Sequence, residues 1–85
     1  MIRQEVLIAG SLPMTRERAG RLVRVANGFD CRILLEYEHG SINGKSLLGL
    51  LSVGRQSLRR YVLVTEGNDE AEAAATLAPL LEAES

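Results

Sequence analysis

Few residues of this 85-residue chain could take part in chemistry, and one serine stands out among them. Ser46 comes directly before an apolar run that ends at Gly54. A hydroxyl residue in this place is typical of a helix N-cap, because its side-chain oxygen can accept a backbone N–H of the first turn. A serine beside exposed apolar side chains can also be a phosphorylation site on a docking surface. The residues around Ser46 leave both interpretations open, an ordinary cap and a modification site.

The leucines that follow Ser46 are more numerous than one buried helix face requires. At 100° per residue, Leu47, Leu50 and Leu51 lie on one side of a helix, and Leu48 lies off it. We therefore expect part of this apolar surface to face water.

The cysteine and histidine content gives little scope for catalysis, disulfide formation or metal binding. Cys31 is the single cysteine and His39 the single histidine, which excludes an internal disulfide and leaves no set of zinc ligands, so no metal or cofactor is expected. A net charge of −1 provides no footprint for nucleic acid. Without a membrane-spanning run or a signal-peptide core, residues 1–85 are predicted to form a single cytoplasmic domain.

Four short runs are predicted to be strands: the first two alternate along one face, the third returns after a turn at His39-Gly40, and the fourth is rich in β-forming residues. These runs are residues 2–8, 31–37, 41–43 and 61–65. The residues expected on the buried strand faces are Ile2, Val6, Ile8, Cys31, Ile33, Leu35 and Tyr37.

Apolar residues at helical spacing predict a helix before residue 28 and another after residue 69, besides the Ser46 helix. Thr15 is expected to cap the first helix, whose buried stripe is Ala19, Leu22, Val23 and Ala26, with Glu17, Arg18, Arg21 and Arg24 opposite. Asn68 or Asp69 is expected to cap the last helix, whose stripe is Ala71, Ala74, Ala75, Ala78 and Leu81. Pro79 lies inside that stripe and predicts a kink or an early end.

The resulting order is β-α-β-β-α-β-α. Because apolar residues gather mainly on one face of each strand, this order favours a two-layer α+β domain, with an antiparallel-rich sheet and all helices on one side.

The element order and several motifs together resemble the HPr family of bacterial phosphocarrier proteins. The resemblance covers nearly the whole chain, and the Lys-Ser-hydrophobic-hydrophobic-Gly run at this place in the order is fairly specific. It rests on Phe29-Asp30, Leu35-Glu36-Tyr37, the run from Gly44 to Ser52, and the run from Glu66 to Ala71. The resemblance implies an open-faced β-sandwich, in which three helices cover one face of a four-stranded antiparallel sheet.

The chain departs from the family where phosphate is carried. Family members have a histidine at the start of the first helix, followed by Ala-Arg-Pro-Ala; here the run is Thr15-Arg16-Glu17-Arg18-Ala19. A threonine hydroxyl is a poor nucleophile without an adjacent base, and its phosphate ester is too stable to hand on. His39 lies in a predicted turn. The expectation is therefore a non-enzymatic protein that has lost carrier activity, with Thr15 serving as a cap.

The resemblance is stronger around Ser46. In the family this serine is phosphorylated by HPr kinase/phosphorylase, and the modified protein binds a LacI-type catabolite control regulator. Catabolite-repression members (Crh) also lack the histidine and keep the serine. The partner-binding positions implied here are Lys45, Leu47, Leu48, Leu51, Arg16, Glu17 and Arg18. Glu17 places a negative charge where the family has a cation.

Two classes of function stay open. The first is a regulatory module switched by phosphorylation at Ser46. The second is an HPr-fold interaction domain that docks a partner without phosphorylation, through the same leucines and the arginines of the first helix. An atypical phosphocarrier is a more distant third. The oligomeric state is open.

Overall fold

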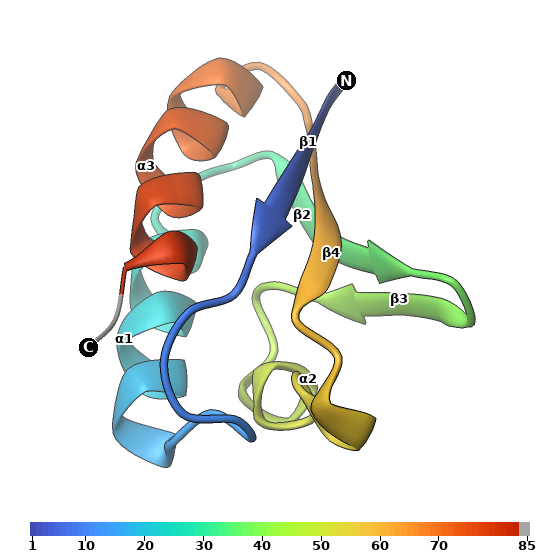
Figure 1. The fold of residues 1–85 in the computed structure, drawn as a ribbon. Coiled ribbons are helices and arrows are strands. Elements are labelled where there is room, and N and C mark those ends of the chain that lie inside the picture. The colour runs from blue at the N-terminus through green and yellow to red at the C-terminus, as the bar shows by residue number, and fades with distance from the viewer. Residues whose placement is uncertain (84–85) are drawn as a thin grey trace.

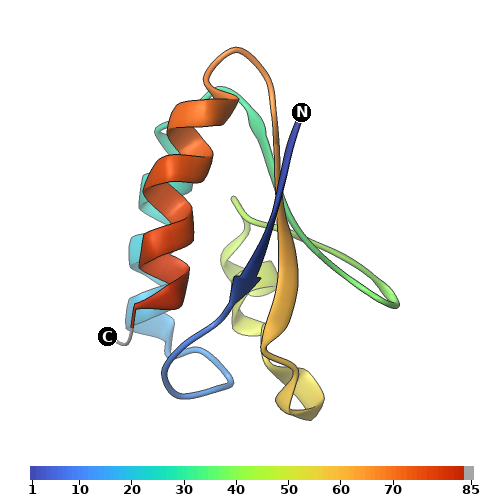
Figure 2. The same cartoon turned by 45° about the horizontal axis from the view of Figure 1, so that its top comes forward.

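Four strands form one antiparallel sheet, and three helices cover one of its faces (Figure 1, Figure 2). The computed structural model describes residues 1–83. The elements are β1 (Ile2–Leu7), α1 (Arg16–Asn27), β2 (Arg32–Tyr37), β3 (Gly40–Asn43), α2 (Leu47–Leu51), the short 3₁₀ helix η1 (Arg55–Ser57), β4 (Arg60–Glu66) and α3 (Glu70–Glu82). The strand order is β1-β4-β2-β3. This arrangement confirms the predicted element order and the open-faced sandwich; η1 is the element that the sequence patterns did not predict.

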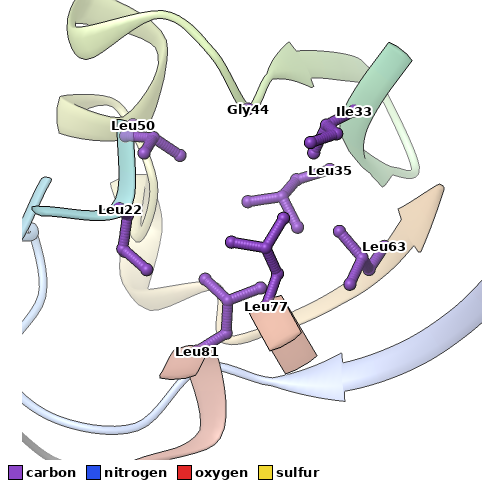
Figure 3. Close-up of a pocket in the computed structure, with 8 residues that line it drawn as sticks. All are labelled: Leu22, Ile33, Leu35, Gly44, Leu50, Leu63, Leu77 and Leu81. Carbon is purple, nitrogen blue, oxygen red and sulfur yellow. The ribbon is translucent and has the colours of Figure 1, made fainter. Parts of the chain in front are cut away.

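The core lies between the sheet and the helices and is filled by aliphatic side chains. Its centre holds a cavity of about 10 Å³, which Figure 3 shows with its lining residues. That volume is about what a single water molecule needs. The lining consists of Leu22, Ile33, Leu35, Gly44, Leu50, Leu63, Leu77 and Leu81. This internal cavity therefore has no room for a substrate.

Helix α3 is rotated relative to the predicted stripe. Ala71 and Ala75 are exposed, whereas Ala73 and Leu77 are buried. Burying Leu77 removes more apolar area from water than burying Ala71 or Ala75 would, so the larger side chain favours this rotation. The helix also continues through Pro79 to Glu82, so an early end at Pro79 is wrong.

Tyr37 was expected in the core, but it is exposed. It lies at the end of β2, where the β2–β3 hairpin extends beyond the helices (Figure 1). Its ring meets that of buried Tyr61 edge to face, with 5.8 Å between the centroids. The strand alternation was right, but no helix covers this end of the hairpin.

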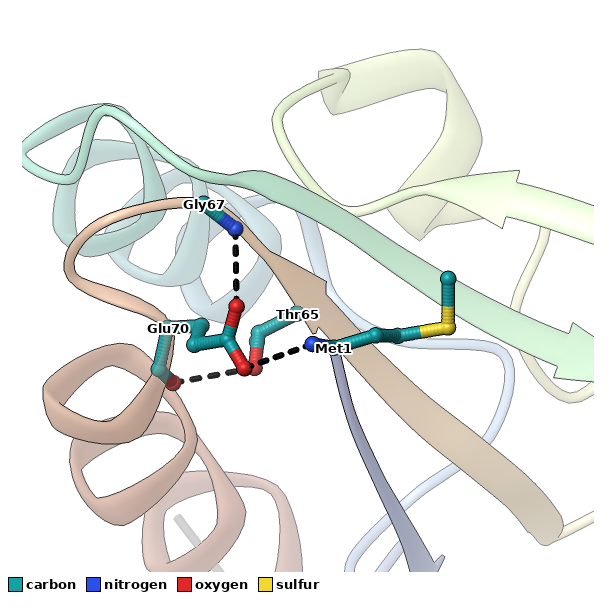
Figure 4. Close-up of polar contacts among 4 residues, drawn as sticks. All are labelled: Met1, Thr65, Gly67 and Glu70. Carbon is teal, nitrogen blue, oxygen red and sulfur yellow. Dashed lines mark hydrogen bonds and ion pairs between the residues drawn. The ribbon is translucent and has the colours of Figure 1, made fainter.

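The start of α3 is tied to the sheet by polar contacts. Asp69 is the N-cap residue, yet its carboxylate accepts the N–H groups of Asp30 at 2.8 Å and Cys31 at 2.9 Å instead of capping its own helix. These bonds, led by that from Asp30, lower the pKa of Asp69. Figure 4 shows the neighbouring Glu70, whose carboxylate binds the amino group of Met1 at 2.7 Å and the Gly67 N–H at 3.1 Å.

Candidate protein-binding surface

Ser46 is the N-cap of α2, as predicted. Its backbone is extended, and its Oγ accepts the N–H of Gly49 at 3.1 Å. Gly49 allows α2 to approach β3 closely, because a Cβ there would lie 2.9 Å from the carbonyl oxygen of Asn43 and 3.1 Å from Cγ2 of Ile42. The glycine of the Lys-Ser-hydrophobic-hydrophobic-Gly run thus has a packing role that holds Ser46 in place.

The leucines of α2 divide between the core and solvent. Leu50 is buried and Leu51 is half-buried against the core. Leu48 is 81% exposed and Leu47 is 38% exposed. The expectation that part of this apolar surface faces water is confirmed. Leu48 contributes most to the exposed surface, and Leu51 only its edge.

Helix α1 brings charged residues next to these leucines. A shallow hollow runs between the helices, lined by Arg16, Glu17, Gly20, Arg21, Arg24 and Leu47. Gly20 lines the hollow and has no side chain to fill it, so a glycine inside the predicted first helix is the sequence feature that indicates this site. We call Arg16, Glu17, Arg21, Arg24, Leu47 and Leu48 the α1–α2 surface. It combines apolar groups with three arginines and one glutamate, a composition suited to a protein partner with apolar and acidic groups.

Lys45 lies beside this surface but is already engaged. Its ammonium donates to the carbonyl oxygen of Phe29 at 2.6 Å, and its own carbonyl oxygen accepts the side-chain N–H of Asn27 at 3.4 Å. Lys45 therefore fastens the segment before α2 to the C-terminal end of α1, which positions the two helices relative to each other.

Arg18 was expected on the exposed face of α1, and this prediction is wrong. The residue is only 4% exposed. It lies one helical turn before buried Leu22, and helical side chains lean toward the helix N-terminus, so its guanidinium reaches the end of α3. It donates to Ala9 O, to Leu81 O at 3.0 Å, to Ala83 O at 3.1 Å and to Leu80 O at 3.4 Å. Arg18 is a structural cation, and it does not belong to the α1–α2 surface.

Thr15 and His39, the residues bearing on carrier chemistry, occupy different parts of the chain. Thr15 is the N-cap of α1, as predicted, and its Oγ1 accepts the N–H of Arg18 at 3.2 Å. His39 is exposed in the turn between β2 and β3. Within residues 1–83, no three His, Cys, Asp or Glu side chains are grouped so that they could hold a metal ion.

Replacing Thr15 with alanine is expected to lower the free energy of unfolding by about 1 kcal/mol, because the N–H of Arg18 loses its acceptor. Thr15→Ser keeps the hydroxyl, so its free energy of unfolding should lie within about 0.5 kcal/mol of the parent's. Urea unfolding of both variants measures the difference. Equal midpoints for the alanine and serine variants would show that the bond contributes nothing.

The structure defines a class of fold: a small open-faced β-sandwich, which here carries a surface of mixed apolar and charged side chains between α1 and α2. Within the described part of the chain, no helix is long and apolar enough to cross a membrane.

Comparisons with known proteins identify the family. The profile described as "PTS HPr component phosphorylation site" matches residues 2–83. The chain belongs to the HPr family, which includes phosphocarriers of the phosphotransferase system and the HPr-like Crh proteins.

Relatives and solved structures agree with this assignment. The HPr-like protein Crh of Halalkalibacterium halodurans is 33% identical over 84 residues, which cover 99% of this chain and all of that protein. The structure of HPr from Thermoanaerobacter tengcongensis superposes with a TM-score of 0.83 at 29% identity, covering 96% of this chain and 92% of that one. Crh of Bacillus subtilis, solved as an intertwined dimer with a swapped domain, superposes with a TM-score of 0.72 at 31% identity, covering 95% and 93%.

Proposed function

We propose that this HPr-family protein is a cytoplasmic regulatory protein that acts by binding a partner and not by carrying phosphate. In this proposal an HPr kinase/phosphorylase modifies Ser46, and the modified protein docks a LacI-type catabolite control regulator. One observation carries the proposal: half-buried Ser46 stands directly before two exposed leucines, and the first of these, Leu47, lines a hollow together with Arg16, Arg21 and Arg24. The similarity to Crh proteins supports it.

The physical basis is a local change of charge. A phosphate on Ser46 adds nearly two negative charges and three acceptor oxygens at neutral pH. Because Ser46 precedes α2 and its Oγ already meets the N–H of Gly49, the anion stays close to backbone N–H donors. The fold is expected to be preserved. Phosphorylation therefore creates an anion beside Leu47 and Leu48, which an arginine-bearing partner can bind through charge-assisted hydrogen bonds.

The test is a titration of both forms. The protein is incubated with HPr kinase and ATP, the phosphate is mapped by mass spectrometry, and each form is titrated against a LacI-type regulator. The expected result is modification at Ser46 and binding of the modified form at least about tenfold tighter, equivalent to about 1.4 kcal/mol. Ser46→Ala is the control for the modification. Leu48→Ser should still be modified yet bind more weakly. No modification, or equal binding of both forms, rejects this function.

A second candidate is an interaction domain that works without phosphorylation. It is favoured by the hydrogen bond between Ser46 Oγ and the Gly49 N–H, since this bond alone accounts for a serine at the cap. In the same titration this candidate predicts that both forms bind equally. It also predicts that Arg24→Ala weakens binding, since Arg24 lines the hollow. A phosphocarrier of atypical chemistry is the remaining alternative.

Carrier activity is expected to be absent. Incubation with phosphoenolpyruvate and enzyme I should leave no acid-labile phosphate, because a threonine hydroxyl is a poor nucleophile with a stable phosphate ester and His39 lies in an exposed turn. Thr15→His alone should restore little transfer, since Glu17 still opposes the incoming phosphate. Acid-labile phosphate on the parent protein, or a near-normal rate for Thr15→His, would contradict this.

A further inference from the structure

The outer edge of the sheet is formed by β1, which pairs only with β4 within the sheet. The N–H of Ile8 donates to the carbonyl oxygen of Arg59 at 2.9 Å, which continues the β1–β4 ladder. Hydrogen-bonded residues alternate along an antiparallel pair, so the backbone groups of Arg3, Glu5 and Leu7 point away from β4. The N–H of Leu7 meets Glu82 of α3 at 3.4 Å, which agrees with this outward direction.

The sequence of this edge is self-complementary about Gln4. Residues 1–7 read Met-Ile-Arg-Gln-Glu-Val-Leu. In an antiparallel pair centred on Gln4, Arg3 lies opposite Glu5 of a second copy, and Gln4 lies opposite itself. Ile2 then faces Val6, and Met1 faces Leu7. Arg3 and Glu5 are also the residues whose backbone groups point outward, so these two positions would exchange both of their hydrogen bonds.

The side chains of the open sheet face fit the same register. The guanidinium of Arg3 forms an ion pair with the carboxylate of Glu36 at 2.7 Å, and the guanidinium of Arg60 forms one with the carboxylate of Glu5 at 3.1 Å. Charges on an edge strand usually prevent pairing. Here, however, pairing of the two β1 strands would place Arg3 next to Glu5 of the other copy. Negative and positive side chains would then alternate across the sheet, from Glu36 to Arg3 to Glu5 of the other copy. Met1 and Leu7, 64% and 54% exposed, would meet at both ends of the seam.

Helix α3 presents small residues toward this edge. Ala71 and Ala75 are exposed on the same side of α3 as Glu82, which reaches the backbone of β1. The helix packs on both β1 and β4. If two copies pair through β1, their two-fold axis runs midway between the two β1 strands. Because neighbouring strands are about 4.8 Å apart, a helix over the gap between β1 and β4 would lie about 5 Å from that axis. The two copies of α3 would then be about 10 Å apart, a normal packing distance for helices.

We propose that two copies of this chain associate through their β1 edges, in the register centred on Gln4, to form one eight-stranded antiparallel sheet. The pairing covers Met1, Leu7, Ala71 and Ala75. It leaves the α1–α2 surface free, because α2 packs against β3, at the opposite edge of the sheet. The association is therefore independent of phosphorylation at Ser46.

A charge-reversal experiment tests the register. The mass of the parent protein, measured by light scattering, should rise from 9.3 kDa toward twice that value as its concentration increases. Arg3→Glu and Glu5→Arg each put like charges across the seam, so each should raise the dimer dissociation constant at least tenfold. An equimolar mixture restores both opposite-charge pairs and should dimerise again. A monomeric parent, single variants that dimerise like the parent, or a mixture that stays monomeric would overturn the proposal.

A cross-linking experiment tests the geometry. Residues in a non-hydrogen-bonded pair have Cα atoms about 4.5 Å apart, which suits a disulfide. Gln4→Cys should therefore form a disulfide-linked dimer on mild oxidation. The control Ser41→Cys, exposed on the other edge strand, should stay mainly monomeric. Burial raises the pKa of the native Cys31 thiol to about 11, so this residue remains unreactive.

Amide exchange separates edge pairing from a swapped dimer in which the two copies exchange β1. Edge pairing should slow the exchange of the Arg3 and Glu5 amides as concentration rises. In a swapped dimer β1 pairs with β4 of the other copy, so these amides would still point away from the sheet. Fast exchange of both amides in a dimer, or no cross-link at residue 4, would overturn the proposal.

Discussion

Replacing Arg18 with leucine is expected to lower the free energy of unfolding by about 3 kcal/mol. The guanidinium donates to four carbonyl oxygens, three of them at the C-terminal end of α3. Leucine fills part of the space but leaves these acceptors without donors, at a cost of about 1–3 kcal/mol for each buried group. It also removes a cation from a helix C-terminus, where positive charge is favourable. The leucine side chain and the removal of a buried charge offset part of this loss.

Urea unfolding measures the effect, and two variants control it. Arg16→Leu removes an exposed arginine from the preceding position and should change stability by less than about 0.5 kcal/mol. Arg18→Lys keeps the charge with fewer donors and should fall between the parent and Arg18→Leu. If Arg18→Leu unfolds like Arg16→Leu, the contacts with α3 do not contribute to stability.

Replacing Gly54 with alanine is expected to lower the free energy of unfolding by about 3 kcal/mol, because two unfavourable effects add. Gly54 has φ of 91°, a left-handed conformation that costs a residue with a Cβ about 1–2 kcal/mol. The new Cβ would also lie 2.5 Å from Cβ of Leu12 and 2.9 Å from its Cγ and Cδ1. Leu12 packs against the core, so relieving this overlap costs about a further 1–3 kcal/mol.

Gly20→Ala is the matched control for Gly54→Ala. Gly20 lies inside α1, where a new Cβ would find no atom closer than 3.6 Å. The free energy of unfolding of Gly20→Ala should rise by about 0.5–1 kcal/mol, since alanine is the better helix former. In a background that carries Leu12→Gly, Gly54→Ala should lower the free energy of unfolding less than it does in the parent, because glycine removes the Cβ, Cγ and Cδ1 atoms that overlap the new side chain. Equal melting temperatures for Gly20→Ala and Gly54→Ala would refute this account of the turn.

Gly54 also links stability to the proposed function. It follows α2, and its N–H donates to the buried hydroxyl of Tyr61 at 3.1 Å. A shift of this turn would move Leu47 and Leu48, which lie one to two helical turns earlier. Partner binding by Gly54→Ala is therefore expected to weaken along with its stability.

Local chemistry in the sequence was sufficient to predict the order of elements and both side-chain helix caps. Thr15 and Ser46 each accept an N–H three residues ahead, a contact that depends only on neighbouring residues. The exposure of Leu48 also followed from local geometry, since a short helix cannot bury leucines on every side. The family resemblance rested on the same short-range patterns.

Tertiary structure decided the roles of residues whose partners are distant in the sequence. Arg18 is charged and close to an arginine-rich face, but the end of α3, more than 60 residues away, supplies the carbonyl groups that bury it. Asp69 could have capped α3, but its carboxylate accepts the N–H groups of Asp30 and Cys31 instead. The rotation of α3, which exposes Ala71 and Ala75, is set by the competition between its leucines and alanines for one core. Helical periodicity restricts which residues share a face, but only the packed neighbours determine which face is buried.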